Sequence, residues 1–168
     1  MHSYTSYINN APQCEPRRSQ IDGIGLFAKV KIKAKEPFMT LSGGRIVAVS
    51  SYFENEAGLI EDEWNAISER ELLVRKNRTY YYFINHQFSP NAIVDIVHKR
   101  VVASADISAH EEITINYLFE PLPKLYLEKW GASFLQRINT KFHGLCDGQP
   151  RLLLAKRATS FRQSAPCI

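Results

Sequence analysis

Three short segments of this chain carry residue types that could do chemistry. In "DGIGLFA", Gly23 and Gly25 open an apolar run, and glycines let backbone N–H groups approach a ligand because no side chain intervenes. In "FINHQFSPNA", Asn85 and His86 stand between an aromatic run and a Ser-Pro-Asn turn. In "ADISAHEEITINY", Tyr117 ends an alternating run that follows two acidic residues. These segments are candidates for one binding or catalytic site.

Each segment also has a purely structural explanation. Asn is favoured in turns, and a His at a strand end is often a hydrogen-bonded structural group. A Gly-x-Gly pair is often only a turn, and the third Gly and following helix of a dinucleotide-binding fingerprint are missing. A strand-terminal Tyr is often a packing residue. No single segment decides between these alternatives.

The elements that would position these segments are mostly strands. Short apolar or alternating runs punctuated by Gly and Pro predict strands at residues 24–32, 37–41, 43–49, 79–85, 92–97, 100–107 and 112–119. An acidic run with apolar residues at roughly helical spacing predicts one or two short helices within 53–75. A final amphipathic helix is predicted over 122–138, whose apolar stripe comprises Leu127, Trp130, Phe134 and Ile138. The fold class is therefore mainly β with short helices.

Length and composition indicate an ordinary globular protein. The 168 residues fit one domain, and 45% hydrophobic with 23% charged residues argues against wholesale disorder. A net charge of +4 is compatible with acidic partners, but solvated basic faces are common, so nucleic acid is not indicated. The last thirty or so residues, 139–168, mix Gly, Pro, Ser, Lys and Arg, and we expect them to be poorly ordered or loosely packed.

Targeting and metal signals are weak. The first twenty residues lack the apolar region of a secretory signal, and no stretch approaches the ~20 apolar residues of a membrane span, which predicts a soluble, intracellular protein without a membrane partner. It would be cytoplasmic, or nuclear in a eukaryote. Three distant cysteines argue against a disulfide framework. His143 and Cys146 have metal-pair spacing, but two ligands do not close a zinc site, so we expect no bound metal.

In this order and at these separations, the three segments resemble the SET-domain family of protein-lysine methyltransferases. The resemblance covers residues 20–119 as the SET core, with the helical insert at about 53–75. It leaves 1–19 as an N-terminal extension, 120–138 as a helix that completes the site, and 139–168 as a tail. It implies several small, mostly antiparallel sheets and a knot-like threading of the C-terminal segment. That threading would bring residues 83–86 beside 112–117.

The resemblance also implies a cofactor, S-adenosylmethionine, and roles for individual residues. The opening segment would contact the amino-acid end of the cofactor through the backbone of Gly23, Ile24, Gly25 and Leu26. Asn85 would hold the methionine portion through its side-chain amide, and His86 would meet the adenine largely through its backbone. An aromatic face against the adenine is implied at Trp130, although packing on the helical stripe explains this residue equally well.

The reaction that the resemblance implies is transfer of a methyl group to a lysine amine. A free Lys with a pKa near 10.4 is only about 0.04% neutral at pH 7, and removing its proton costs roughly 5 kcal/mol at that pH. A narrow apolar and aromatic channel lowers this cost by disfavouring the charged form. The catalytic residue would be Tyr117, whose hydroxyl would orient the amine. The channel candidates are Tyr80, Tyr82 and Phe119.

Departures from the family pattern affect the substrate side. Leu41 and Tyr82 stand where Tyr and Arg are common, Phe88 follows the Asn-His pair where Cys is common, and His110 replaces the usual Gly before the acidic pair. The cysteine clusters that often flank the core are lacking. The enzyme reading predicts a protein substrate with a target lysine, a basic histone-like protein being one candidate. The acidic stretch Glu61, Asp62 and Glu63 would help to attract such a peptide, or it would be only a solvated face. The alternative is a SET-like binding module without turnover.

Overall fold

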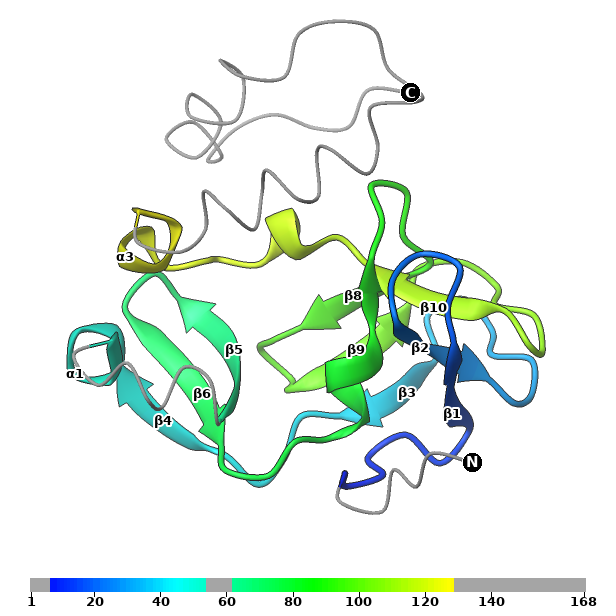
Figure 1. Cartoon of the computed structure of the whole chain (residues 1–168), viewed down its shortest axis with the longest axis horizontal. Coiled ribbons are helices and arrows are strands. Elements are labelled where there is room, and N and C mark those ends of the chain that lie inside the picture. The colour runs from blue at the N-terminus through cyan, green and yellow to red at the C-terminus, as the bar shows by residue number, and fades with distance from the viewer. Residues whose placement is uncertain (1–6, 54–61, 129–168) are drawn as a thin grey trace, which may run out of the picture. The chain divides into compact units, whose positions relative to one another are not determined.

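The computed structural model of the chain describes residues 7–53 and 62–128 (Figure 1). The chain divides into two units, Met1–Lys129 and Trp130–Ile168, and every described residue belongs to the first. Of the predicted C-terminal helix, the described part contains α3, Lys124–Tyr126. Trp130 and the predicted tail lie outside the described residues. No helix in the described part of the chain is long and apolar enough to cross a membrane.

Three small sheets dominate the described residues, so the predicted mainly β class with short helices is confirmed (Figure 1). The largest has the order β1-β2-β10-β7, formed by Cys14–Arg18, Ile24–Ala28, Glu112–Ile115 and Asn85–His86. A second has the order β3-β9-β8, formed by Pro37–Thr40, Arg100–Ala103 and Ala92–Asp95. The third has the order β4-β6-β5, formed by Arg45–Ala48, Glu71–Arg75 and Glu63–Ser68. The remaining short elements are α1 (Val49–Phe53) and the 3-10 turns η1 (Tyr80–Phe83) and η2 (Tyr117–Phe119).

The pairing of β7 with β10 brings two candidate segments together. β10 pairs antiparallel with β2 on one side and parallel with β7 on the other. In the parallel pair, Thr114 lies opposite Asn85 and Ile115 lies opposite His86. The expected juxtaposition of residues 83–86 with 112–117 is therefore confirmed, while the knot-like threading stays a prediction.

The core lies between the sheets and is formed by their apolar faces. Leu26 of β2 and Ile113 of β10 are completely buried, and they pack in one cluster with Phe83 of η1 and Val101 of β9. Since burial of one such side chain is worth about 1.5–3 kcal/mol, this cluster fixes the strands that carry the candidate site.

The prediction of helices within 53–75 is wrong for residues 63–75, which form the hairpin β5–β6. The apolar spacing that suggested a helix runs across a turn at 69–70. β6 is the central strand of its sheet, and its consecutive Leu72, Leu73 and Val74 are all buried, as expected for a strand covered on both faces. Within the expected insert, residues 54–61 lie outside the described residues.

The prediction of a strand over 79–85 is also wrong in part. The side-chain hydroxyl of Thr79 accepts a hydrogen bond from the Tyr81 N–H at 3.2 Å. This N-cap starts the 3-10 turn η1, and the two-residue strand β7 follows it. Likewise, the strand predicted over 112–119 ends at residue 115, because the Asn116 side chain accepts from the Leu118 N–H (3.0 Å) and starts η2.

Part of the expected N-terminal extension belongs to the core sheet. Residues 14–18 form β1, which pairs along β2 at the sheet edge. Pro16 and two arginines hid this strand in the sequence, but Pro and charged residues are typical of edge strands, where some N–H groups face solvent.

A buried ion pair joins β5 to β6. The Arg75 Nε donates to Glu63 Oε1 at 2.8 Å, and the two side chains are 3% and 5% exposed. Thr79 donates to the same carboxylate through its hydroxyl (2.8 Å) and its N–H (3.0 Å), and Arg75 also donates to Asn65 Oδ1. Glu63 is therefore unavailable for the peptide attraction expected of the acidic stretch at 61–63.

We expect Arg75→Met to lower the free energy of unfolding by about 3–5 kcal/mol, because it leaves the Glu63 carboxylate buried without its charge partner. Urea unfolding of the full chain, followed by circular dichroism, measures this. The control is Lys31→Met, which breaks the exposed ion pair with Asp106 (2.7 Å) and should leave the unfolding midpoint nearly unchanged. Equal effects of the two substitutions would contradict the expectation.

Candidate functional site

The side chain of Asn85 is the centre of the polar contacts at the edge of β7. Its Nδ2 donates to Glu112 Oε1 (2.8 Å), to the Asp22 carbonyl (3.0 Å) and to the Ser19 hydroxyl oxygen (3.1 Å). The Ser19 hydroxyl in turn donates to the Glu112 carboxylate at 2.7 Å. The amide of Asn85 thus ties the loop at 19–23 to the first residue of β10.

Gly23 and Gly25 meet different requirements in this arrangement. A Cβ at Gly25 would overlap the Glu112 carboxylate, so the glycine permits the close approach of β2 to that side chain. Gly23 has φ +47°, in the left-handed region that favours glycine, and a Cβ there would meet nothing within 4 Å. Ile24, between the two glycines, is half-buried. Leu26, directly after Gly25, is completely buried, so it could contact a ligand only through its backbone.

His86 is buried and neutral at physiological pH. Burial lowers the pKa of the imidazole to about 4, and Nδ1 accepts a hydrogen bond from the Tyr117 N–H at 3.2 Å. An accepting Nδ1 places the ring proton on Nε2. The imidazole also lies 5.2 Å from the Tyr117 ring and 4.9 Å from the Phe88 ring, measured between centroids. His86 therefore positions the start of η2.

The hydroxyl of Tyr117 points back to the chain just before β7, where it donates to the Ile84 carbonyl. Burial, followed by the negative charges of Glu120 and Asp22, raises the pKa of Tyr117 well above its ordinary value. The phenol is therefore protonated at neutral pH, so it can act as a fixed dipole and not as a base.

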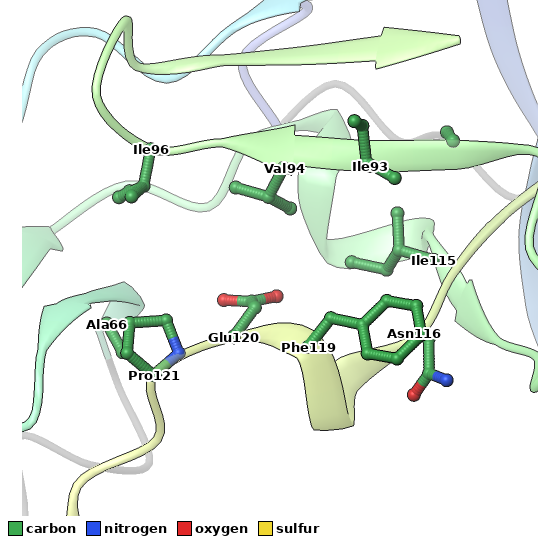
Figure 2. A pocket seen from close by; sticks show the side chains of 10 residues that line it. Ala66, Ile93, Val94, Ile96, Ile115, Asn116, Phe119, Glu120 and Pro121 are labelled. Atoms are coloured by element: carbon green, nitrogen blue, oxygen red, sulfur yellow. The ribbon is translucent and has the colours of Figure 1, made fainter. Parts of the chain in front are cut away.

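The three channel candidates are placed differently. Phe119 is 62% exposed and lines a cavity of about 110 Å³ (Figure 2). Tyr80 packs against the core, with its ring 6.0 Å from that of Phe83. Tyr82 is 52% exposed, and the Arg78 guanidinium lies over its ring, 4.5 Å from the centroid of the Tyr82 ring. The channel roles of Tyr80 and Tyr82 stay predictions.

Sequence reasoning missed Tyr81 and Glu120. The Tyr81 hydroxyl donates to Glu120 Oε1 at 2.6 Å, and the charge of Glu120 contributes, after burial, to a raised pKa of Tyr81. In the expected strand over 79–85, alternation would place Tyr80 and Tyr82 on one face and Tyr81 on the other. The 3-10 geometry of η1 instead brings Tyr81 to Glu120. In the sequence, the signal for this turn was Thr79, a residue whose side chain can cap a helical turn.

Glu112 and Ser19 were also missed as site residues. The sequence offered the acidic pair at 111–112 as a signal, since a carboxylate at the start of a strand beside a Gly-x-Gly segment is a ready acceptor. The predicted adenine contact Trp130 lies outside the described residues, so the site is described without it.

Comparison with known proteins gives the family. A family model of the SET domain matches residues 23–118, which is more than half of the chain. A solved structure titled "Crystal structure of an active polycomb repressive complex 2 in the basal state" is similar at 21% identity with a TM-score of 0.52 over 64% of this chain. The match spans 15% of that structure's chain, and at this identity it shows the fold. A search of curated proteins finds no match. The described sheets and the matched segment together show that this chain belongs to the SET-domain family.

Proposed function

We propose that this chain transfers a methyl group from S-adenosylmethionine to a lysine side chain of a protein substrate. The observation that carries the proposal is the parallel pairing of β7 with β10, because it places Asn85 and His86 directly beside the strand that leads to Tyr117. The Asn85 amide, as the group that would hold the cofactor, and the half-buried phenol of Tyr117 would then belong to one site. Membership of a family of protein-lysine methyltransferases supports the same reaction.

The residues present fit the methionine end of the cofactor. Within the described residues, Asn85 Oδ1 accepts no hydrogen bond, while the Glu112 carboxylate and the Asp22 carbonyl lie beside the same amide. Acceptor oxygens of these kinds suit an α-ammonium group. The open space at Gly23 leaves room for backbone approach. Bound there, the cofactor would supply a methyl group already activated on a sulfonium.

The chain's own task is then to bind, orient and partly desolvate the lysine amine. The Tyr117 oxygen is held by its hydrogen bond to the Ile84 carbonyl, and the buried ring keeps the phenol protonated. A fixed oxygen can accept an N–H from a neutral amine and direct its lone pair. Apolar side chains around the cavity at Phe119 would exclude water.

We expect Asn85→Ala to weaken S-adenosylmethionine binding by about 10-fold to 100-fold, because it removes a polar contact to the cofactor and releases the loop at 19–23. Isothermal titration calorimetry measures the affinity. Asn91→Ala is the matched control, since Asn91 also makes three hydrogen bonds, to Glu111, to the Glu112 carbonyl and from the Thr114 N–H. It should cost comparable stability and leave the affinity unchanged. An intact chain that binds no S-adenosylmethionine would overturn the proposed function.

Tyr117→Phe should keep the fold and the cofactor affinity while lowering the methylation rate by about 10-fold to 1000-fold, in the range for loss of one preorganised polar contact. Transfer of tritiated methyl groups to the proteins of a cell lysate measures the rate. Retention of the parent rate would reduce Tyr117 to a packing residue. A parent chain that binds the cofactor and methylates nothing would favour the binding module without turnover.

A further inference from the structure

The cavity beside η2 is too small for the cofactor and suits one side chain. It measures about 110 Å³, whereas pockets for drug-sized ligands and cofactors typically measure about 300–1,000 Å³. A cavity of roughly 150 Å³ can enclose a benzene molecule, so the space is adequate for a butyl chain. Most of its lining is apolar and comes from β8, β10, η2 and the residues beside them: Ile93, Val94, Ile96, Ile115, Phe119 and Pro121. Ala66 and Ala92 complete the apolar lining, and the polar lining residues are Asn116 and Glu120.

One ionisable group points into this apolar space. Figure 2 shows the Glu120 carboxylate directed toward Val94, with Phe119 and Pro121 on either side. The Tyr81 hydroxyl holds Oε1 at 2.6 Å. Ile93 and Phe119 are 45% and 62% exposed, so the rim of the cavity is open to an incoming side chain.

Among the described residues, the charges behind the cavity do not neutralise Glu120. The charge of Arg75 favours the carboxylate, but its guanidinium already pairs with Glu63 at 2.8 Å and donates to Asn65. When Glu120 is ionised, Glu63 and Glu120 share one guanidinium, which leaves one negative charge among these three side chains. A charge in an apolar site calls for a partner of opposite sign.

The element opposite supplies no such partner. From β8, the side chains that line the cavity are apolar, and Asp95 pairs elsewhere, with Arg100 Nε at 2.9 Å and His98 Nδ1 at 2.8 Å. The complement of an apolar cavity with one carboxylate is an ammonium group on an aliphatic stem, which is a lysine side chain.

Glu120 is also joined to the proposed catalytic residue. Its N–H donates to the Tyr117 carbonyl at 3.4 Å across η2. Glu120 is the C-cap residue of η2, directly after the turn that begins at Tyr117. The carboxylate is close enough to raise the pKa of Tyr117.

We propose that Glu120 is the charge partner of the substrate lysine and accepts its proton. One N–H bond of the ammonium breaks, an O–H bond forms on the Glu120 carboxyl, and the electron pair stays on Nζ, where it is available for methylation. The carboxyl returns the proton to solvent after transfer. This role rests on the proposed methyl transfer, and it assigns the deprotonation that Tyr117, itself protonated, does not perform.

The titration behaviour of Glu120 agrees with that role. Burial raises the pKa of the carboxyl, and the Tyr81 hydrogen bond, contact with Asn65 and the charge of Arg75 oppose the rise. The groups facing it are therefore Tyr81 from η1, Asn65 and Arg75 from the β5–β6 hairpin, and Tyr117 from η2. A raised pKa of the carboxyl group lies closer to the pKa of a lysine ammonium group, so proton transfer from the ammonium to the carboxylate costs less free energy.

The first test uses n-butylammonium as a lysine side-chain probe and needs neither cofactor nor turnover. The full chain, carrying glutamate with ¹³C-labelled carboxyls, is titrated with the probe at pH 8. We expect saturable binding that shifts the Glu120 signal and lowers its apparent pKa by at least about one unit. No binding, or binding without a change in the Glu120 titration, overturns the proposal.

Two variants with opposite expectations separate charge pairing from structural support. Glu120→Gln should weaken probe binding at least about tenfold, because a neutral amide replaces the carboxylate. Tyr81→Phe removes the hydroxyl that holds Glu120 but keeps the charge, so binding should be unchanged or tighter. A structural role for Glu120 would weaken binding in both. The control Glu69→Gln makes the same charge change at an exposed turn and should behave as the parent.

The second test separates this inference from the proposed function. In the lysate assay, Glu120→Gln should bind S-adenosylmethionine as the parent does, and its methylation rate should rise only at higher pH, where lysine loses its proton unaided. A parental rate and pH profile in this variant would overturn the role of Glu120 and leave the methyltransferase proposal standing. A parent that binds n-butylammonium but methylates nothing would support the cation site and remove the proposed transfer.

Discussion

The parallel pairing of β7 with β10 is the constraint on which the rest of the site depends. β7 has only two residues, so other parts of the chain must fix its position. These are the η1 turn before it and its pairing with Thr114 and Ile115 of β10. This register sets two contacts. It brings the Asn85 amide to Glu112, at the start of β10, and it brings the His86 ring to the backbone N–H of Tyr117, just after the end of β10. A shift of one residue would exchange the faces of the pair and break both.

The polar groups around this pairing are held in defined protonation states. Burial keeps His86 neutral with Nδ1 as an acceptor, and burial together with nearby carboxylates keeps Tyr117 protonated. Neither group is then suited to take a proton from an amine, because one is too weakly basic and the other already carries its proton. Within the described residues, the carboxyl group that combines burial with proximity to Tyr117 is Glu120. The division between orienting groups and a proton acceptor follows from burial and not from residue type alone.

The sequence predicted the fold class and the meeting of the Asn-His and Tyr segments, because these depend on strong patterns: apolar alternation, turn residues and motif order. It did not predict the β5–β6 hairpin, since Leu72 to Val74 read equally well as a buried strand or part of a helix. It missed Tyr81 because a single side-chain cap from Thr79 turns a strand-like aromatic run into a 3-10 turn. Contacts such as Glu112 with Ser19, 93 residues apart, cannot be derived from local pattern at all.

The backbone at position 110 shows how local strain is accepted near such a site. His110 has φ +71°, in the left-handed region, where a side chain costs roughly 1–2 kcal/mol relative to glycine. Its N–H nevertheless donates to the Ala28 carbonyl at 2.7 Å, and the turn it completes leads through Glu111 to Glu112, the first residue of β10. The backbone geometry is thus preserved at a cost in stability. This turn fixes where Glu112 begins β10, and Glu112 accepts a hydrogen bond from the Asn85 amide. The backbone conformation of His110 therefore affects the proposed cofactor site, even though the His110 side chain is exposed and remote from the cavity at Glu120.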